Sequence, residues 1–584
     1  MCFSYKIKRR NIYTFLLNYI GSFSARYWFI ILLFIYILAS RLYNLGADPP
    51  IHLSSSGGLF GDEMAYAHNA RNKILFGNWI TDGWNPFIYS PILTILEYLS
   101  FSVIGVGLVQ LRLVNVIVVL FSFLLLFIIL KKNGGERVAL IAILLLGFNY
   151  VFLMYSRLGL NDTFLIFPIT LTLYLWQKGL NKQPILFLAG MSSFACYVTK
   201  ASALYFIIAT FISLVFALFQ RYRKDNTINE IILPLAYFLS GVGISFVFWY
   251  IFFFSPHKME FTSISEDWFR LAMPSNIARF WHNLTSFTFP KYMSRTPIEL
   301  VISWSYAPLI IYGLLKNWKK VRPIEIFVFL WAIGGYIALN GLNYRPLRYY
   351  VTLIPAICIL ASFALDKMWE GIYQKKFTIN KVSLIWSSFF WLVYAIWIII
   401  FLKNGISYQK ILEEAYSFIV MTIILMIFFL IIQKIRQVSI VVNWKSVFQI
   451  FIKSTVVSII FLTLYINGSY YLRWVGNAKY TVMDVSKELG KMLDQAYIAG
   501  LWSPLATIEN RHKALYVGNN WFNYKDTFKK YPITHLFLWD GNNAEELRFL
   551  ERAYPETMKR ASILKIYTIK GLPVRLYKIN NDNK

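Results

Sequence analysis

The chain has 584 residues, of which 57% are hydrophobic, and its formal net charge at pH 7 is +29. Ordinary soluble domains are only about 45–50% apolar. Apolar runs long enough to cross a bilayer, which takes roughly 17–25 residues, recur along the whole sequence. These features exclude an ordinary soluble protein and predict a polytopic all-α membrane protein.

The positive charge raises the question of nucleic-acid binding, since a basic patch is the footprint of phosphate recognition. Here, however, lysine and arginine lie mostly in short loops between apolar runs, which is the pattern that sets membrane topology. We therefore expect the lipid bilayer, and no nucleic acid, as a partner. Cys196 and Cys358 lie in apolar runs and Cys2 lies at the terminus, so neither a disulfide framework nor a cysteine metal cluster is predicted.

The N-terminal segment is basic and has no small-residue cleavage site before the first apolar run, residues 27–45. We interpret it as an uncleaved cytoplasmic end. The first outer loop, residues 46–110, follows and contains Asp62 and Glu63. Further spans are predicted at about residues 111–131, 137–155, 163–178, 184–199, 201–220, 231–254, 298–315, 324–342, 347–365, 384–402, 415–433 and 450–467.

The run at residues 87–107 is long enough to cross the membrane, yet it contains Glu97, Ser90 and Pro91. If it does not cross, every strongly basic short loop falls on the side of the N-terminus, as the positive-inside rule requires. We therefore predict a juxtamembrane or re-entrant helix here. This leaves about 13 crossings of the plasma (cell) membrane, with the N-terminus cytoplasmic and the C-terminus outside. The count stays open by one helix pair, because residues 184–220 form a tight pair.

The composition changes beyond residue 468. Apolar residues at helical spacing predict a helix at 478–496, and two final strands at 562–569 and 573–579 flank Gly571 as a hairpin. Between them we expect a helix start at Ser503-Pro504, short strands at 514–517 and 536–539, and helix-like stretches at 523–531 and 543–553. The prediction is thus a membrane domain, residues 1–468, with outer loops 46–110 and 255–297. Residues 469–584 form a small soluble extracytoplasmic α/β domain.

With this topology, four polar clusters face the outer side of the membrane. Acidic residues at a membrane boundary are costly to bury and are interpreted as functional by default. Lysine and arginine are unexpected in short outer loops, and cations there suit a lipid-linked phosphate. The clusters are Asp62-Glu63, the turn with Arg157 and Asp162, Lys200, and the turn with Arg345, Arg348 and Tyr349.

Each cluster also has a purely structural explanation. Arg345 and Arg348 would serve as interfacial anchors, and Arg157 and Asp162 as an ordinary ion pair. Lys200 would be an ordinary helix-end lysine, and the Asp62-Glu63 pair would occupy the first turn of a helix. The joint occurrence of cations and carboxylates on one side of the membrane favours a functional site over four separate structural roles.

The segment Gly61-Asp62-Glu63-Met64-Ala65-Tyr66, followed by Gly77-Asn78-Trp79, resembles the first-loop motif of the GT-C glycosyltransferases. More narrowly, it resembles the protein O-mannosyltransferase and lipid A aminoarabinose transferase group. Further motifs of that group are matched by Ser156-Arg157 with Asn161-Asp162-Thr163, by Tyr197-Val198-Thr199-Lys200, and by Arg345-Pro346-Leu347-Arg348-Tyr349 with Pro355. The resemblance covers roughly residues 27–365. Residues 84–91 lack the paired His and the Lys-Pro-Pro of aminoarabinose transferases, which counts against that sugar.

The resemblance implies a GT-C-like integral membrane glycosyltransferase. Such an enzyme takes a sugar from a polyprenyl-phosphate donor and passes it to a hydroxyl of an acceptor protein, lipid or cell-envelope glycan at the outer face. A phosphodiester departs as a stable anion, so one carboxylate acting as a base suffices, whereas glycoside hydrolysis uses two. The reaction then inverts the anomeric centre by direct displacement.

The predicted roles follow from this chemistry. Asp62 is the expected base, which is ionised at neutral pH because the ordinary pKa of aspartate is about 3.9. Glu63, which holds local structure, and Asp162, which orients the acceptor or Arg157, complete the candidate catalytic set. The expected substrate-binding residues are Arg157, Lys200, Arg345, Arg348 and Tyr349, with the cations of Lys200, Arg345 and Arg348 on the donor phosphate.

A metal site and a transporter function are the two alternatives to consider beside this interpretation. The six histidines are scattered and form no ligand pair, so no metal site is predicted and no cofactor is required, with a divalent cation left open. The main rival function is a transporter or flippase of lipid-linked sugars. Transporters often carry inverted repeats and charges at the membrane midplane. Here the acidic residues lie at one face of the membrane, which favours the transferase.

Overall fold

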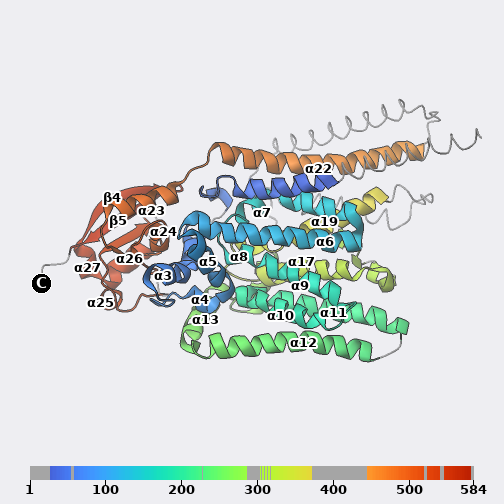
Figure 1. Ribbon diagram of the computed structural model, residues 1–584, viewed down its shortest axis with the longest axis horizontal. Coiled ribbons are helices and arrows are strands. Elements are labelled where there is room, and N and C mark those ends of the chain that lie inside the picture. The colour runs from blue at the N-terminus through green and yellow to red at the C-terminus, as the bar shows by residue number, and fades with distance from the viewer. Residues whose placement is uncertain are drawn as a thin grey trace, which may run out of the picture.

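The computed structural model describes residues 27–53, 58–225, 228–285, 303, 306–307, 310–311, 313–315, 317–370, 444–517, 522–539 and 545–580. A bundle of helices makes up most of the molecule, and a smaller α/β domain built from the C-terminal residues covers one end of it (Figure 1). The predicted spans at 384–402 and 415–433, and most of the one at 298–315, lie outside the described residues.

The first two spans after the outer loop form a helical hairpin within α6 (Leu108–Phe148). The backbone of Gly135 has φ of 86° inside this helix, a conformation that glycine adopts without steric cost. The rings of Phe123 and Phe152 lie 5.9 Å apart, although a straight helix between them would extend about 43 Å. The chain therefore reverses at Gly135, between the predicted spans 111–131 and 137–155.

The other described helices of the bundle overlap the predicted spans. The first is Tyr27–Leu42, which lies beside the C-terminal bundle helix (Figure 1), where the Tyr471 hydroxyl donates to the Ser40 carbonyl at 3.0 Å. The remaining ones are α9 (Ile166–Gly179), α10 (Ile185–Thr199), α11 (Leu204–Asp225), α12 (Asn229–Trp249), α17 (Pro323–Asn340), α19 (Ile354–Glu370) and α22 (Trp444–Gly476). Short helical turns extend two of them: Ala201–Ala203 precedes α11, and a π-helix, Tyr250–Phe254, follows α12.

Membrane-spanning character follows from the length and composition of these helices. Among the described residues, five helices are long and apolar enough to cross a bilayer, and Tyr27–Leu42, Pro91–Ile104 and Ile185–Thr199 are shorter apolar helices. The chain is therefore a polytopic helical membrane protein, as predicted. The number of 13 crossings and the sidedness of the termini stay predictions.

The doubtful run at 87–107 is not one long helix. It contains α4 (Pro86–Tyr89) and α5 (Pro91–Ile104), and α5 begins with Pro91 at its first turn. An α-helix of 14 residues is about 21 Å long, which is less than the roughly 30 Å of a bilayer core. Helix α9 has the same 14 residues and α10 has 15, so length alone does not separate α5 from the predicted spans, and its juxtamembrane or re-entrant placement stays a prediction.

Short helices at the end of the bundle near the C-terminal domain carry most of the motifs. They connect the bundle helices where polar and glycine residues interrupt the apolar pattern. They comprise a 3-10 turn at Ile51–Leu53, α2 (Gly58–Tyr66), α3 (His68–Phe76), α7 (Tyr150–Tyr155), α8 (Asn161–Phe164), α13 (Lys258–Ala272), α14 (Ile277–Thr285) and α18 (Leu347–Val351). A further 3-10 turn, Trp318–Lys320, precedes α17. The predicted span 347–365 is thus two helices, α18 and α19, with Pro355 in the first turn of α19, where its missing N–H costs nothing.

The C-terminal domain contains a five-stranded sheet with the order β2-β1-β3-β5-β4. Strand β1 (Tyr497–Ala499) pairs in parallel with β2 (Lys513–Leu515) and β3 (His535–Trp539), and the hairpin of β4 (Ala561–Ile569) and β5 (Leu572–Ile579) pairs antiparallel. Its helices are α23 (Thr481–Met492), α24 (Ser503–Thr507), α25 (Thr527–Lys530), α26 (Glu545–Ala553) and α27 (Pro555–Lys559). Gly571 turns the hairpin with φ of 84°, as predicted. Strand β1 and helix α27 were not predicted.

The first outer loop and the C-terminal domain share one hydrophobic core. Met64, Ala67 and Ala70 pack in the same buried cluster as Leu505 and Phe537 of the domain. Polar contacts fix the same interface, since the buried Arg71 guanidinium donates to the carbonyls of Thr507, Asn510 and His512. Asp48 also accepts hydrogen bonds from the first backbone N–H groups of α23, which caps that helix from outside.

Helix α22 runs without interruption from the bundle to Gly476, past the predicted domain boundary at 468 and 469. The division into a membrane domain and a soluble extracytoplasmic domain stays a prediction. What the fold establishes is that helix α2, with Asp62 and Glu63, lies between the end of the bundle and the C-terminal sheet.

Candidate functional site

Asp62 and Arg348 form an ion pair that joins the first and the last of the predicted motifs. Helix α2 carries Asp62 and helix α18 carries Arg348, and Nη1 of the arginine donates a hydrogen bond to the Asp62 carboxylate. The side chains are 22% and 10% exposed, respectively. The pair is therefore shielded from bulk water but still reachable from it.

Asp162 and Lys200 form a second ion pair beside the first. The Lys200 ammonium donates to Asp162 Oδ1 at 2.5 Å, and the Asp162 side chain is fully buried. Asp162 lies in the first turn of α8, and Lys200 follows the last residue of α10. The two residues meet because α8 leads into α9 and Lys200 follows α10. The start of α9 and the end of α10 lie side by side, which brings their polar residues together.

The two pairs meet at Arg348. Its Nε lies 3.9 Å from Asp162 Oδ2, and neither atom has a hydrogen-bond partner among the described residues. The ring of Tyr349 supports the cluster from one side, with the Lys200 ammonium 4.0 Å from the ring centroid, a favourable position over the negative face of an aromatic ring. Four of the predicted site motifs therefore converge on one partly open cluster of two cations and two carboxylates.

Burial changes the acidity of this cluster. Burial raises the pKa of Asp62 above its usual value, the charge of Arg348 opposes this change, and the charge of Asp162 adds to it. Burial also lowers the pKa of Lys200 to about 8, although Asp162 favours its charged form. Perturbed groups of this kind, with named charge partners, are typical of functional sites.

Arg345 lies in the turn before α18, three residues before Arg348. Its Nη1 donates to the carbonyl oxygens of Asn283 on α14, at 2.5 Å, and of Asn340 on α17, at 2.8 Å. No carboxylate forms an ion pair with it among the described residues. Its positive charge is thus held in place by neutral backbone groups and remains available to an anion.

Glu63 points away from this cluster. Its two carboxylate oxygens accept hydrogen bonds from the Arg112 guanidinium at 2.6 and 2.9 Å, and both side chains are buried. Burial alone would raise the pKa of Glu63, but Arg112 outweighs it and holds that pKa below its usual value. Arg112 also donates to the carbonyls of Leu45 and Ala47. Arg112 thus joins Glu63 to the backbone of the first outer loop, and the role of Glu63 as local support for the catalytic set stays a prediction.

Arg157 forms no ion pair with Asp162, so the structure does not support orientation of Arg157, one of the two roles considered for Asp162. The Arg157 guanidinium donates to the carbonyls of Ser40 and Asn44 at 3.2 and 2.6 Å, and it stacks over the Trp474 ring at 4.3 Å. These residues belong to the ends of the first helix and of α22. The reason is that the turn after α7 sends residues 157 and 162 to different neighbours, and Lys200 occupies the place beside Asp162.

Several residues near the site were not predicted. Arg112 lies inside the apolar run of α6, and an arginine within such a run is itself the signal that it has a buried partner. Tyr344 accepts a hydrogen bond from Arg348 Nη2 at 3.3 Å. Tyr66 lies one helical turn after Asp62 in α2, and Trp84 lies near Tyr66, with ring centroids 6.4 Å apart. Aromatic residues are common in membrane proteins, so the sequence offered no way to single these out.

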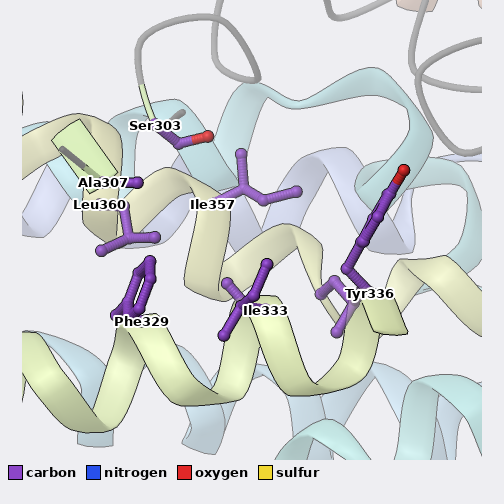
Figure 2. Close-up of a pocket in the computed structure, with 9 residues that line it drawn as sticks. Ser303, Ala307, Phe329, Ile333, Tyr336, Ile357 and Leu360 are labelled. Carbon is purple, nitrogen blue, oxygen red and sulfur yellow. The ribbon is translucent and has the colours of Figure 1, made fainter. Parts of the chain in front are cut away.

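A small pocket between α17 and α19 is distinct from this cluster. Figure 2 shows that its walls are apolar, with Phe329 and Ile333 from α17 facing Ile357 and Leu360 from α19. Tyr336 closes one end, and its hydroxyl donates to the Leu284 carbonyl at 3.4 Å. No charged residue lines the pocket, in contrast to the Asp62–Arg348 cluster.

A metal site finds no support in the described parts of the chain. They contain no group of three or more His, Cys, Asp or Glu residues placed to hold an ion. Asp62 and Asp162 are already matched by Arg348 and Lys200. The expectation that no cofactor is required stays a prediction.

Comparison with known proteins gives one family match and one distant relative. Residues 89–250 match the model of the dolichyl-phosphate-mannose-protein mannosyltransferase family. An uncharacterized protein of Aquifex aeolicus (strain VF5) is 22% identical over 377 residues, which is 62% of this chain and 67% of that protein.

Solved structures resemble the whole chain at low sequence identity. ArnT from Cupriavidus metallidurans, bound to undecaprenyl phosphate, matches with a TM-score of 0.52 and 13% identity, over 94% of this chain and 97% of that one. The oligosaccharyltransferase AglB from Archaeoglobus fulgidus, with an inhibitory peptide and a dolichol-phosphate, matches with a TM-score of 0.45 and 12% identity, over 88% and 69% of the two chains. Residues 89–250 thus carry the mannosyltransferase family pattern, and the chain as a whole has the fold of a GT-C glycosyltransferase, as its motifs predicted.

Proposed function

We propose that the protein is an integral membrane glycosyltransferase that moves a sugar from a polyprenyl-phosphate donor to an acceptor hydroxyl at the outer face, with inversion. The observation that carries the proposal is the cluster of Asp62, Arg348, Asp162 and Lys200. It combines a phosphate-binding pair of cations with a partly exposed carboxylate. The family match over residues 89–250 and the fold shared with ArnT, whose structure contains undecaprenyl phosphate, support the same class of donor.

The cations of the cluster suit the phosphate of a lipid carrier. Arg348 Nε has no hydrogen-bond partner among the described residues, and arginine presents a planar fork of donors that matches a phosphate. Lys200, which follows the last residue of α10, and Arg345, which lies between α17 and α18, add two more charges. A lipid phosphate at the membrane boundary would approach these residues without leaving the layer of the headgroups.

Donor binding would also prepare the base. Arg348 holds the Asp62 carboxylate. A phosphate anion competes for the same guanidinium and would release Asp62 toward the acceptor. This exchange gives an order to the reaction, because the base is fully available only when the donor is in place.

The transfer itself needs one proton acceptor. Asp62 takes the proton of the acceptor hydroxyl while the acceptor oxygen forms a bond to the anomeric carbon. The bond between that carbon and the phosphate oxygen breaks, and its electron pair leaves with the polyprenyl phosphate. Arg348 and Lys200 stabilise the additional negative charge on the leaving phosphate, and Asp162 keeps Lys200 oriented toward it.

The test is transfer by the purified full-length protein in lipid nanodiscs. The donors are polyprenyl phosphates that carry radiolabelled mannose, glucose or aminoarabinose, and the acceptors are serine and threonine peptides, lipids and envelope glycans. Membranes and glycoproteins from cells with and without the gene, compared by mass spectrometry, would name the natural product. We expect labelled product with one donor. Movement of intact donor across the bilayer with no transfer product would replace the proposal with the transporter function.

A further inference from the structure

A row of aromatic rings joins the first outer loop to the C-terminal domain. Trp84 of the loop lies 5.2 Å from Tyr516 and 4.4 Å from Phe522 of the domain, measured between ring centroids, and 6.4 Å from Tyr66 of α2. Tyr89 continues the row at 6.2 Å from Trp84, and its buried hydroxyl has no hydrogen-bond partner among the described residues. All five rings are only partly buried, so they form a wall and not the centre of a core.

Polar contacts hold this aromatic wall in position. The Trp84 indole N–H donates to the Ala65 carbonyl at 2.7 Å, and the Trp84 backbone N–H donates to Asp82 Oδ1 at 2.7 Å. The same carboxylate contacts His68 Nε2 at 2.7 Å through its other oxygen. Asn523 of the C-terminal domain donates to Asp82 at 3.1 Å and accepts from the Gly83 N–H at 2.7 Å. The rings are thus fixed by contacts to both parts of the chain, which pre-organises the wall for a ligand.

The aromatic wall lies next to the proposed base. Tyr66 follows Asp62 by four residues in α2, so the two side chains share one face of that helix. On the domain side, burial and then the charge of Asp62 raise the pKa of Tyr516 well above its usual value. Both ends of the wall therefore lie within electrostatic reach of the carboxylate that would take the acceptor proton.

The rings and the cations proposed for the donor phosphate come from different elements. The cations are on α18 and after α10. The rings come from α2, the loop before α4, α4 itself and the C-terminal domain. A molecule in contact with the rings would therefore reach Asp62 from the side of the first outer loop and the C-terminal domain, while the donor phosphate would lie at Arg348 and Lys200.

We propose that this aromatic wall is the acceptor subsite and that it binds the ring of a saccharide. The C–H face of a pyranose is apolar and packs on aromatic faces, while its hydroxyl groups can bond the tyrosine hydroxyls at the edges. The inference rests on the proposed transfer reaction and narrows the acceptor to a sugar-bearing molecule. It also gives the C-terminal domain a direct part in the site through Tyr516 and Phe522.

The rings could instead serve only to join the two domains, and the experiment must separate these roles. We would compare Trp84→Ala and Tyr516→Leu with the conservative variants Trp84→Phe and Tyr516→Phe, using the full-length protein. Trp281→Ala is the matched control, since Trp281 is an exposed tryptophan of α14 outside the wall. Thermal unfolding of every variant reports loss of the domain contact independently of ligand binding.

Two readouts test the proposal. Saturation-transfer NMR with free N-acetylglucosamine, mannose and their β-linked disaccharides detects sugar C–H protons held against rings without any need for transfer. Transfer kinetics with a saccharide acceptor and with a hydroxyl-bearing peptide then give KM and kcat separately. We expect Trp84→Ala and Tyr516→Leu to lose the NMR signal and to raise the saccharide KM by about tenfold or more. The phenylalanine variants and Trp281→Ala should retain both, and binding of the lipid donor should not change in any of them.

Saccharide NMR signals that persist in Trp84→Ala would overturn the acceptor subsite. So would a preference for the peptide acceptor together with a saccharide KM that is unchanged in Trp84→Ala. A fall in donor binding would assign the rings to the sugar of the donor and would equally overturn it. Saccharide binding by a protein that transfers nothing would instead contradict the proposed transfer function while leaving the binding site intact.

Discussion

The carboxylate of Asp62 accepts a hydrogen bond from the guanidinium of Arg348, although 286 residues separate them in the chain. The ion pair of Asp162 and Lys200 lies beside the pair of Asp62 and Arg348. The proposed base and a proposed phosphate-binding cation are thus paired with each other. In the proposed reaction, binding of the donor and release of the base would be two parts of one event.

Donor binding should depend on pH through Lys200. Its lowered pKa of about 8 means that the ammonium is charged below about pH 8 and loses its proton above it. A phosphate should therefore bind more weakly as the pH rises from 7 to 9, by up to the roughly 10- to 100-fold that a charged hydrogen bond contributes. The measurement is the affinity of purified protein for a fluorescent polyprenyl phosphate at several pH values.

Two variants sharpen this test. Lys200→Gln should bind weakly at every pH, and Lys200→Arg should retain affinity at pH 9 because guanidinium stays protonated. An unchanged pH profile in Lys200→Gln would mean that Lys200 does not contact the phosphate.

Glu63→Gln should reduce stability more than it affects the chemical step. Glu63 and Arg112 are both buried and share two hydrogen bonds, and removing one member of such a pair typically costs about 3–5 kcal/mol. The apparent unfolding temperature in detergent measures the effect. Glu488→Gln is the control, because Glu488 pairs with Lys565 at the surface, where both side chains are more than 40% exposed. Such a surface pair contributes only about 0–1 kcal/mol, so equal effects of the two substitutions would refute the supporting role of Glu63.

Reporter fusions after Lys132 and after Asn510 should report opposite sides of the membrane. The backbone N–H of Leu108 donates to Glu509 of the C-terminal domain at 2.8 Å. Lys132 lies about 36 Å further along the same helix, which is more than the roughly 30 Å of a bilayer core. We expect the fusion near Lys132 to be cytoplasmic and the one near Asn510 to be outside. Two fusions on the same side would invalidate the proposed topology.

The sequence was most informative where chemistry and topology agreed. Asp62, Asp162, Lys200 and Arg348 were found because charged residues at an apolar boundary carry a cost that packing does not explain. The separation of the spans 111–131 and 137–155 followed from the break between two apolar runs, and the turn at Gly571 followed from a glycine between two predicted strands. The sequence did not show which charged residues form ion pairs with each other, because these pairs depend on how helices far apart in the chain pack together.

Arg157 and Arg112 illustrate this limit. Arg157 lies in a motif and was expected beside Asp162, yet it binds backbone carbonyls near Trp474. Arg112 lies in no motif and is the partner of Glu63. The aromatic wall could not be predicted from the sequence either. Trp84 and Tyr516 are distant in sequence and meet only because the C-terminal domain packs on the first outer loop.

The most direct test of the account is transfer of labelled sugar from polyprenyl phosphate by the Asp62→Asn variant, with carrier binding measured separately. Asparagine keeps the size of the side chain but cannot take the acceptor proton, so transfer should slow by roughly 10²–10⁴-fold. Because Arg348 then no longer pairs with the Asp62 carboxylate, donor affinity should be retained or increased. Near-normal turnover in Asp62→Asn would contradict the assignment of the base, and Asp162, the other carboxylate of the cluster, would take its place as the candidate.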